Sequence, residues 1–242
     1  MSDIYNDYSY KRYKRPFRRR LFPIAVVVLT LGILFFIANL MFGFISFAPG
    51  ATKVSIPTVT FYVAESESFS SKSDAIEQAT IIKSSGGSGY LLVDSGQWVV
   101  VREISNKEIV SGKKYTTAQK DLKLACKDHI NAVAVLLESF STTFDRLCEY
   151  IEKFEHDVTS QNEIANNARL AYNNLIELAN QFENTPGTSN DPTCAQIVVY
   201  LTRQLLGLNM VWMEGSSDNF AHVLKNAASW VIFALFDLTN AL

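Results

Sequence analysis

The sequence predicts an α+β protein with a single N-terminal transmembrane helix, a small sheet domain and a C-terminal helical bundle. Three observations support this fold class: an uncharged apolar stretch near the N-terminus, strand-like alternation early in the chain, and apolar residues spaced by three and four later on. We expect, in order, a basic cytoplasmic tail (1–20), a transmembrane anchor (21–48), a linker (49–57), the sheet domain (58–137) and the helical bundle (138–242).

The anchor is predicted from length and charge. No charged residue occurs from Leu21 to Thr52, and a bilayer core about 30 Å thick needs roughly 20 apolar residues of helix. Seven of the ten residues at 11–20 are lysine or arginine, which favours a cytoplasmic N-terminus and an extracytoplasmic remainder. A cleaved signal peptide is the alternative, but its apolar core is normally only about 7 to 15 residues. We therefore expect a single-pass protein of the cell membrane.

Charge argues against a nucleic-acid partner. Beyond the anchor the chain has 15 basic and 22 acidic side chains, a net charge of −7, which disfavours the capture of polyanions. The cysteines Cys126, Cys148 and Cys194 are odd in number and widely spaced, which predicts neither a metal site nor a dense disulfide framework. A single disulfide stays open as an alternative, because the exterior of a cell is oxidising.

The chain has no motif that predicts catalysis. It contains no Gly-x-Ser-x-Gly, His-Glu-x-x-His or Cys-x-x-Cys sequence. Glu65 and Glu67 fit a carboxylate pair on one face of a strand, but a solvated edge is the simpler interpretation. We therefore expect neither an enzyme nor a cofactor.

Residues 58–102 have the pattern of a strand, a helix and two further strands. Alternating apolar residues at 59–63 predict the first strand, and a Ser-x-x-Asp capping box at Ser71 predicts the start of the helix. Gly86 and Gly87 follow this helix and precede a strand, which is the reverse of a phosphate-binding loop. We interpret them as a helix stop, followed by a hairpin that turns at residues 94–96.

The stretch "FYVAESESFSSKSDAIEQATIIKSSGGSGYLLVDSGQWVVV" resembles the SPOR domain, a bacterial extracytoplasmic module of βαββαβ order. The resemblance rests on hydrophobic positions and turns across residues 58–102. Residues 116–130 have the pattern of a second helix, with Thr116 and Gln119 as a capping pair, and 131–137 fit the fourth strand of this order. The apolar run at 131–137 fits a continuing helix equally well, because short apolar runs do not distinguish the two.

The resemblance implies binding of peptidoglycan, especially of glycan strands stripped of peptide, on the open face of the sheet. Sugars present apolar ring faces and hydroxyls, which aromatic side chains with polar neighbours can hold. Proteins of cell division or sporulation are the further partners that it implies. The predicted glycan-binding residues are Tyr62, Tyr90, Trp98 and Arg102, with a core or sheet-edge position as the alternative for each aromatic side chain.

From Phe140 to Phe182 the apolar residues form one seam, along a single long helix or along two helices that break near 156–162. Two more helical stretches follow, at 194–213 and 219–242. We favour an intramolecular bundle over a dimeric coiled coil, because glutamine and alanine interrupt the seam. The alternative function is a protein-interaction scaffold, in which the sheet domain binds no glycan and the helices recruit a partner.

Overall fold

The computed structural model describes residues 53–124, 127–202, 205 and 219–241. The predicted tail and anchor, residues 1–48, lie outside the described residues. Among the helices that are described, none has both the length and the apolar character needed to cross a membrane. Residues Ala51–Leu242 form one compact unit of α+β type, in which the described elements are five α-helices, two short irregular helices and two small sheets.

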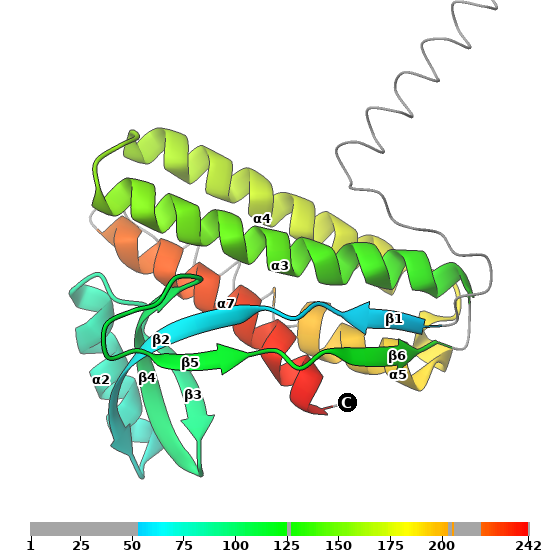
Figure 1. The fold of residues 1–242 in the computed structure, drawn as a ribbon, viewed down its shortest axis with the longest axis horizontal. Helices are drawn as coiled ribbons and strands as arrows, with labels where there is room; N and C mark the ends of the chain where they lie inside the picture. The colour runs from blue at the N-terminus through cyan, green and yellow to red at the C-terminus, as the bar shows by residue number, and fades with distance from the viewer. Residues whose placement is uncertain (1–52, 125–126, 203–204, 206–218, 242) are drawn as a thin grey trace, which may run out of the picture. The chain divides into compact units, whose positions relative to one another are not determined.

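The larger sheet has four antiparallel strands in the order β3-β4-β2-β5 (Figure 1). Helix α2 follows β2, and the β3–β4 hairpin follows α2. The strand, helix, strand, strand order predicted over 58–102 is therefore confirmed. The elements are β2 (Thr60–Phe69), α2 (Lys72–Ser84), β3 (Tyr90–Asp94), β4 (Gln97–Ser105) and β5 (Lys113–Thr116).

Local turn chemistry explains where these elements begin and end. The Ser71 hydroxyl accepts a hydrogen bond from the Ser73 amide at 3.1 Å and caps the N-terminus of α2. After α2 the chain turns through Gly86 at a φ of 82°, a left-handed conformation that glycine adopts without strain. The hairpin turns at Ser95 and Gly96, whose positive φ values match the twist of the two strands.

The second half of the predicted βαββαβ unit is wrong. Residues 116–130 do not form one helix, because they include the end of β5 and strand β6 (Lys120–Lys123). Strand β6 pairs antiparallel with β1 (Lys53–Ile56), which lies in the predicted linker. Leu122 is buried between exposed Asp121 and Lys123, so the period is that of a strand. Strand β6 is extended because it pairs with β1, which lies about 70 residues earlier in the chain.

The predicted boundary between a sheet domain and a separate helical bundle is also wrong. Residues 131–137 are helical and belong to α3 (Lys127–Glu155), which continues past the expected boundary without a break. Helix α4 (Gln161–Glu183) follows, and its N-cap is Ser160. The sequence leaves open a single long helix or two helices that break near 156–162, and the structure shows the second. Because α3 packs against β1 as well as α4, sheets and helices share one core.

The C-terminal helix completes this core. Helix α7 (Phe220–Ala241) packs against both α3 and the sheet, and Figure 1 shows it crossing behind β2 and β5. Seam residues such as Phe144 and Phe182 are buried inside the unit, which favours the intramolecular bundle. Between α4 and α7 the described elements are the 3-10 helix η1 (Thr188–Asn190), α5 (Pro192–Ile197) and the π-helix η2 (Val198–Thr202).

The glycine-rich turn after α2 is fastened to α7 by polar contacts. The Asn226 amide donates to the Ser88 carbonyl at 2.6 Å, and the hydroxyls of Ser88 and Ser229 lie 2.8 Å apart. The Nδ1 atom of His222 lies 2.9 Å from the Gly87 carbonyl oxygen. Buried polar groups need such partners. The turn therefore both ends α2, as predicted, and docks the C-terminal helix on the sheet.

Candidate functional site

The two faces of the four-stranded sheet have different coverage. Helices α3 and α7 pack on one face, and α2 packs on the β3–β4 half of the other. The β2–β5 half of this second face is partly accessible, and in Figure 1 no helix is drawn in front of β2 and β5. We call it the open half-face and define it by Thr60, Tyr62, Ser105, Lys114 and Thr116, which are exposed or half-buried.

Tyr62 lies at the centre of the open half-face. Its neighbour Val63 is fully buried in the core, so alternation along β2 directs Tyr62 to the opposite side. The register pairs Tyr62 with Ser105 on β4 and with Lys114 on β5. Cross-strand partners point to the same face, so the phenol ring has a hydroxyl on one side and an ammonium group on the other.

Tyr90 lies on the other face and is covered by α7. Its ring stacks on Phe233 with centroids 5.0 Å apart and meets Trp230 edge-on at 5.2 Å. Burial is the main reason that the pKa of the Tyr90 phenol is raised well above its usual value. Of the two positions weighed for this aromatic side chain, the structure shows the core position.

Trp98 and Arg102 lie on the same side of the sheet as Tyr62 but in different surroundings. Trp98 is half-buried beside α2, and the Lys72 ammonium nitrogen stands 5.1 Å from the centroid of its ring. Arg102 is exposed and is the extra residue of a β-bulge in β4, where the register shifts between Ala64 and Glu65. Tyr62 and Arg102 are thus the more accessible members of the predicted set.

Sequence reasoning missed the contribution of β5 to this face. The sequence of residues 104–115 indicates a long loop, yet Lys113–Thr116 pair with β2 along four positions. The only available signal is the alternation of exposed Lys114, half-buried Tyr115 and exposed Thr116. Three residues are too few to distinguish a strand from a loop.

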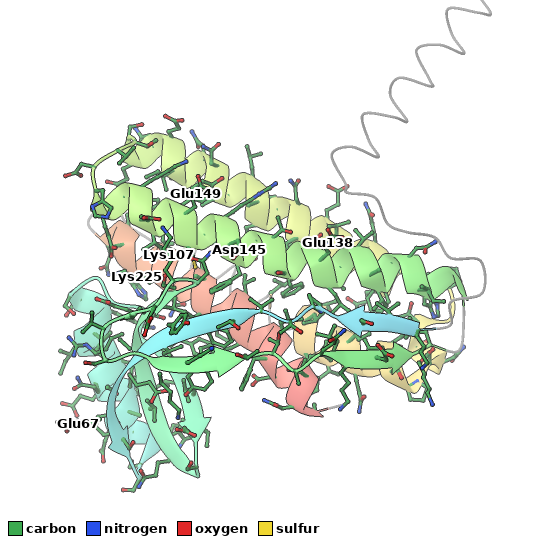
Figure 2. All side chains as sticks on the ribbon, viewed as in Figure 1. Glu67, Lys107, Glu138, Asp145, Glu149 and Lys225 are labelled. Carbon is green, nitrogen blue, oxygen red and sulfur yellow. The ribbon has the colours of Figure 1, made fainter. Side chains whose placement is uncertain are left out.

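A polar network lies on the face opposite the open half-face, because Tyr115 and Lys113 are the cross-strand partners of buried Phe61 and Val63. The Tyr115 hydroxyl donates a hydrogen bond to the Glu65 carboxylate, and the Lys113 ammonium pairs with Asp94. Burial, followed by the bond to Glu65, raises the pKa of Tyr115. Glu65 is therefore held by Tyr115, whereas Glu67 is exposed and projects from the outer end of β2 in Figure 2.

A crevice of about 210 Å³ opens beside the end of β4, between residues 103–109, α3 and α7. Lys225 pairs with Glu155 at 2.7 Å and Lys107 pairs with Glu152 at 2.6 Å, so these charges neutralise one another. Figure 2 shows Lys107 and Lys225 close together at this junction. Burial raises the pKa of the Cys148 thiol to about 12, which keeps it protonated at neutral pH. The lysines of the crevice are paired with carboxylates and its thiol is protonated, so none of these groups is prepared to bind a charged ligand or to act as a nucleophile.

The chain matches no protein-family model, no curated protein and no solved structure. Its resemblance to the SPOR domain therefore rests on the sequence pattern alone.

Proposed function

We propose that this chain is a non-catalytic binding protein of the cell envelope that holds glycan strands of peptidoglycan on the open half-face of its sheet. The observation that carries the proposal is the position of Tyr62, on an accessible stretch of sheet with Ser105 and Lys114 as its cross-strand neighbours. An aromatic ring can stack on the apolar face of a sugar, while neighbouring hydroxyl and ammonium groups bond to its hydroxyls. Such a site needs no net positive charge.

The surroundings of Tyr62 support a polar, extended ligand. The Thr60 and Thr116 hydroxyls lie 3.3 Å apart across β2 and β5, two residue pairs along from Tyr62 and on the same face. Exposed Arg102 lies on the same side of the neighbouring strand. These groups add hydrogen-bonding capacity on both sides of the ring. A strand of linked sugars fits this arrangement better than a compact apolar ligand, because the half-face is lined by polar groups around one aromatic side chain.

The protein-interaction scaffold has less support within the described residues. A docking surface for another protein usually presents a contiguous apolar patch. The exposed large apolar side chains are instead spread over several segments: Ile76 and Ile81 on α2, Val93 on β3, Val110 and Val158 in loops, Leu170 on α4 and Val199 on η2.

Co-sedimentation with insoluble peptidoglycan tests the proposal. A single aromatic platform binds weakly, and an insoluble polymer offers many sites, so retention on the polymer is the suitable measurement. The full chain in mild detergent is incubated with intact peptidoglycan and with peptidoglycan stripped of peptide by an amidase. We expect greater retention on the stripped polymer, and a loss of most retention in Tyr62→Ala.

Two further variants separate binding from folding. Tyr62→Phe keeps the ring and should keep most of the retention, because stacking supplies the main contact. Tyr150→Ala removes a half-buried tyrosine of α3 and should leave retention unchanged. Absence of retention by the folded wild type, or equal retention by wild type and Tyr62→Ala, would contradict the proposal.

A further inference from the structure

Three residues that can ligate a metal converge where α3 begins and where α4 connects to α5. His129 lies near the start of α3, Asp191 is the N-cap of α5, and Cys194 lies within α5. One ligand atom of each residue lies within 4.8 Å of the ligand atoms of the other two. The three residues are buried, with exposed fractions of 1%, 4% and 0% respectively. They lie apart from the open half-face and from the proposed glycan site.

The distance between the two softest donors fits a shared metal ion. The Nδ1 atom of His129 and the Sγ atom of Cys194 are 3.4 Å apart. In a tetrahedral zinc site with Zn–S near 2.3 Å and Zn–N near 2.0 Å, the sulfur and nitrogen stand about 3.5 Å apart. The same distance also fits a hydrogen bond from the thiol to the imidazole, so the two arrangements are the alternatives to be distinguished.

The groups around the cluster hold its donors in the orientation that a metal requires. The Nε2 atom of His129 lies 3.0 Å from the Pro186 carbonyl oxygen, which favours a proton on Nε2 and a lone pair on Nδ1 toward Cys194. Metal-binding histidines usually make this second bond. The Asp191 carboxylate accepts the amide of Thr193 at 2.9 Å and that of Cys194 at 3.3 Å, which restricts its rotation.

The loop before α5 passes beside His129 and turns at a glycine. Gly187 has a φ of 87°, where residues with a side chain are strained. A Cβ atom at this position would stand 3.7 Å from Cε1 of His129, which is ordinary van der Waals contact, so the loop passes beside the imidazole. The 185–191 segment is therefore tied to His129 both by this packing and by the Pro186 carbonyl.

We propose that His129, Asp191 and Cys194 bind one Zn²⁺ ion, with a fourth donor such as water completing the coordination. A thiolate, an imidazole and a carboxylate together suit zinc, whereas magnesium and calcium select oxygen ligands only. Zinc replaces the thiol proton, so binding releases one proton from Cys194 and leaves a neutral set of two anionic ligands and one dication. Because the site is buried, its role is structural: it fastens the α4–α5 connection to the start of α3.

Cobalt substitution tests the site directly. The full chain is purified in mild detergent, its metal content is measured by mass spectrometry, and Co²⁺ is added to the metal-free protein. We expect one zinc per chain and, with cobalt, a thiolate-to-metal charge-transfer band together with the strong visible bands of tetrahedral cobalt. Cys194→Ser should abolish the charge-transfer band. Cys148→Ser removes another buried thiol and should leave the band unchanged.

Three measurements do not depend on folding of the Cys194→Ser variant. Zinc added to the metal-free wild type should raise the melting temperature and release about one proton per chain at neutral pH. Asp191→Asn retains an oxygen to cap α5 but loses the charge, so its zinc affinity should fall at least several-fold. Failure of the folded wild type to bind zinc or cobalt would overturn the proposal and leave the hydrogen-bonded cluster alone. Persistence of the band in Cys194→Ser would overturn it as well.

Discussion

The two faces of the four-stranded sheet differ in packing: one is buried in the core, and half of the other is accessible. On the face toward α7, Phe61 meets the rings of Phe144, Phe233 and Phe236 with centroids 5.5 to 6.0 Å apart, and it is fully buried. On the other face, α2 covers only a small cluster around Val100, and the β2–β5 half stays accessible. One well-packed face is therefore enough to hold the sheet, and half of the other face can stay accessible.

Phe61→Ala should give the largest effect. It removes a fully buried ring from an aromatic cluster and leaves a cavity, which typically costs about 3 to 5 kcal/mol of unfolding free energy. The adjacent Tyr62→Ala acts on the open half-face and should cost less than about 1 kcal/mol. Urea denaturation of the two variants measures this contrast directly. Similar losses in both would show that the two faces do not differ as described.

Val100→Ala tests the smaller cluster beneath α2. Val100 is fully buried against Ala75, Ala79 and Ile82, and truncation removes two methyl groups. We expect a loss of roughly 1.5 to 3 kcal/mol, less than for Phe61→Ala, because the cluster is smaller. Val93→Ala in the same hairpin is the control, since Val93 is 58% exposed. A loss as large as that of Phe61→Ala would mean that α2 stabilises the sheet as much as α7 does.

Ser66→Ala tests the bulge in β2 that lies between the two halves of this face. The Ser66 hydroxyl accepts a hydrogen bond from the Val100 amide at 3.0 Å, where the register between β2 and β4 shifts. Removal of the acceptor leaves a partly buried amide unpaired and should cost about 1 kcal/mol. Ser68→Ala changes an exposed serine of the same strand and should have a smaller effect. Hydrogen exchange of the Val100 amide should accelerate only in Ser66→Ala.

The smallest expected effect concerns pH. The hydrogen bond from Lys113 lowers the pKa of Asp94 below its unfolded value, so the pair stabilises the fold above about pH 4. This contribution is lost as the pH falls through the folded pKa. Because both side chains are well exposed, the effect is small. Melting temperatures between pH 2 and 6 should fall slightly less steeply for Asp94→Asn than for wild type, and an unchanged slope would exclude a contribution from the pair.

Local sequence patterns predicted one region of the fold well. The capping serine at Ser71, the alternation along β2 and the two-residue hairpin turn each depend on residues within a few positions, and all three are present. The same alternation placed Tyr62 on the face opposite Val63. These features are local because hydrogen bonds in caps and turns, and side-chain direction along a strand, are decided by neighbouring residues.

The failures have a common cause in pairing between distant segments. Strands β1 and β6 are only four residues long and exist as partners of each other, about 70 residues apart in the chain. Tyr90 occupies a strand position that suits either face, and its burial is decided by α7, which brings Trp230 and Phe233 to it. Neither the β1–β6 pairing nor the burial of Tyr90 can be predicted from neighbouring residues in the sequence.

The order of elements over residues 58–102 and the direction of Tyr62 follow from the sequence alone, because each depends on side-chain period or turn chemistry. Tertiary structure alone decided which half of the sheet stays open and that His129, Asp191 and Cys194 meet. Both depend on where α7 and the α4–α5 connection pack. Burial of apolar surface drives that packing. Because the hydrophobic effect is non-directional, no local sequence motif predicts which segments pack together.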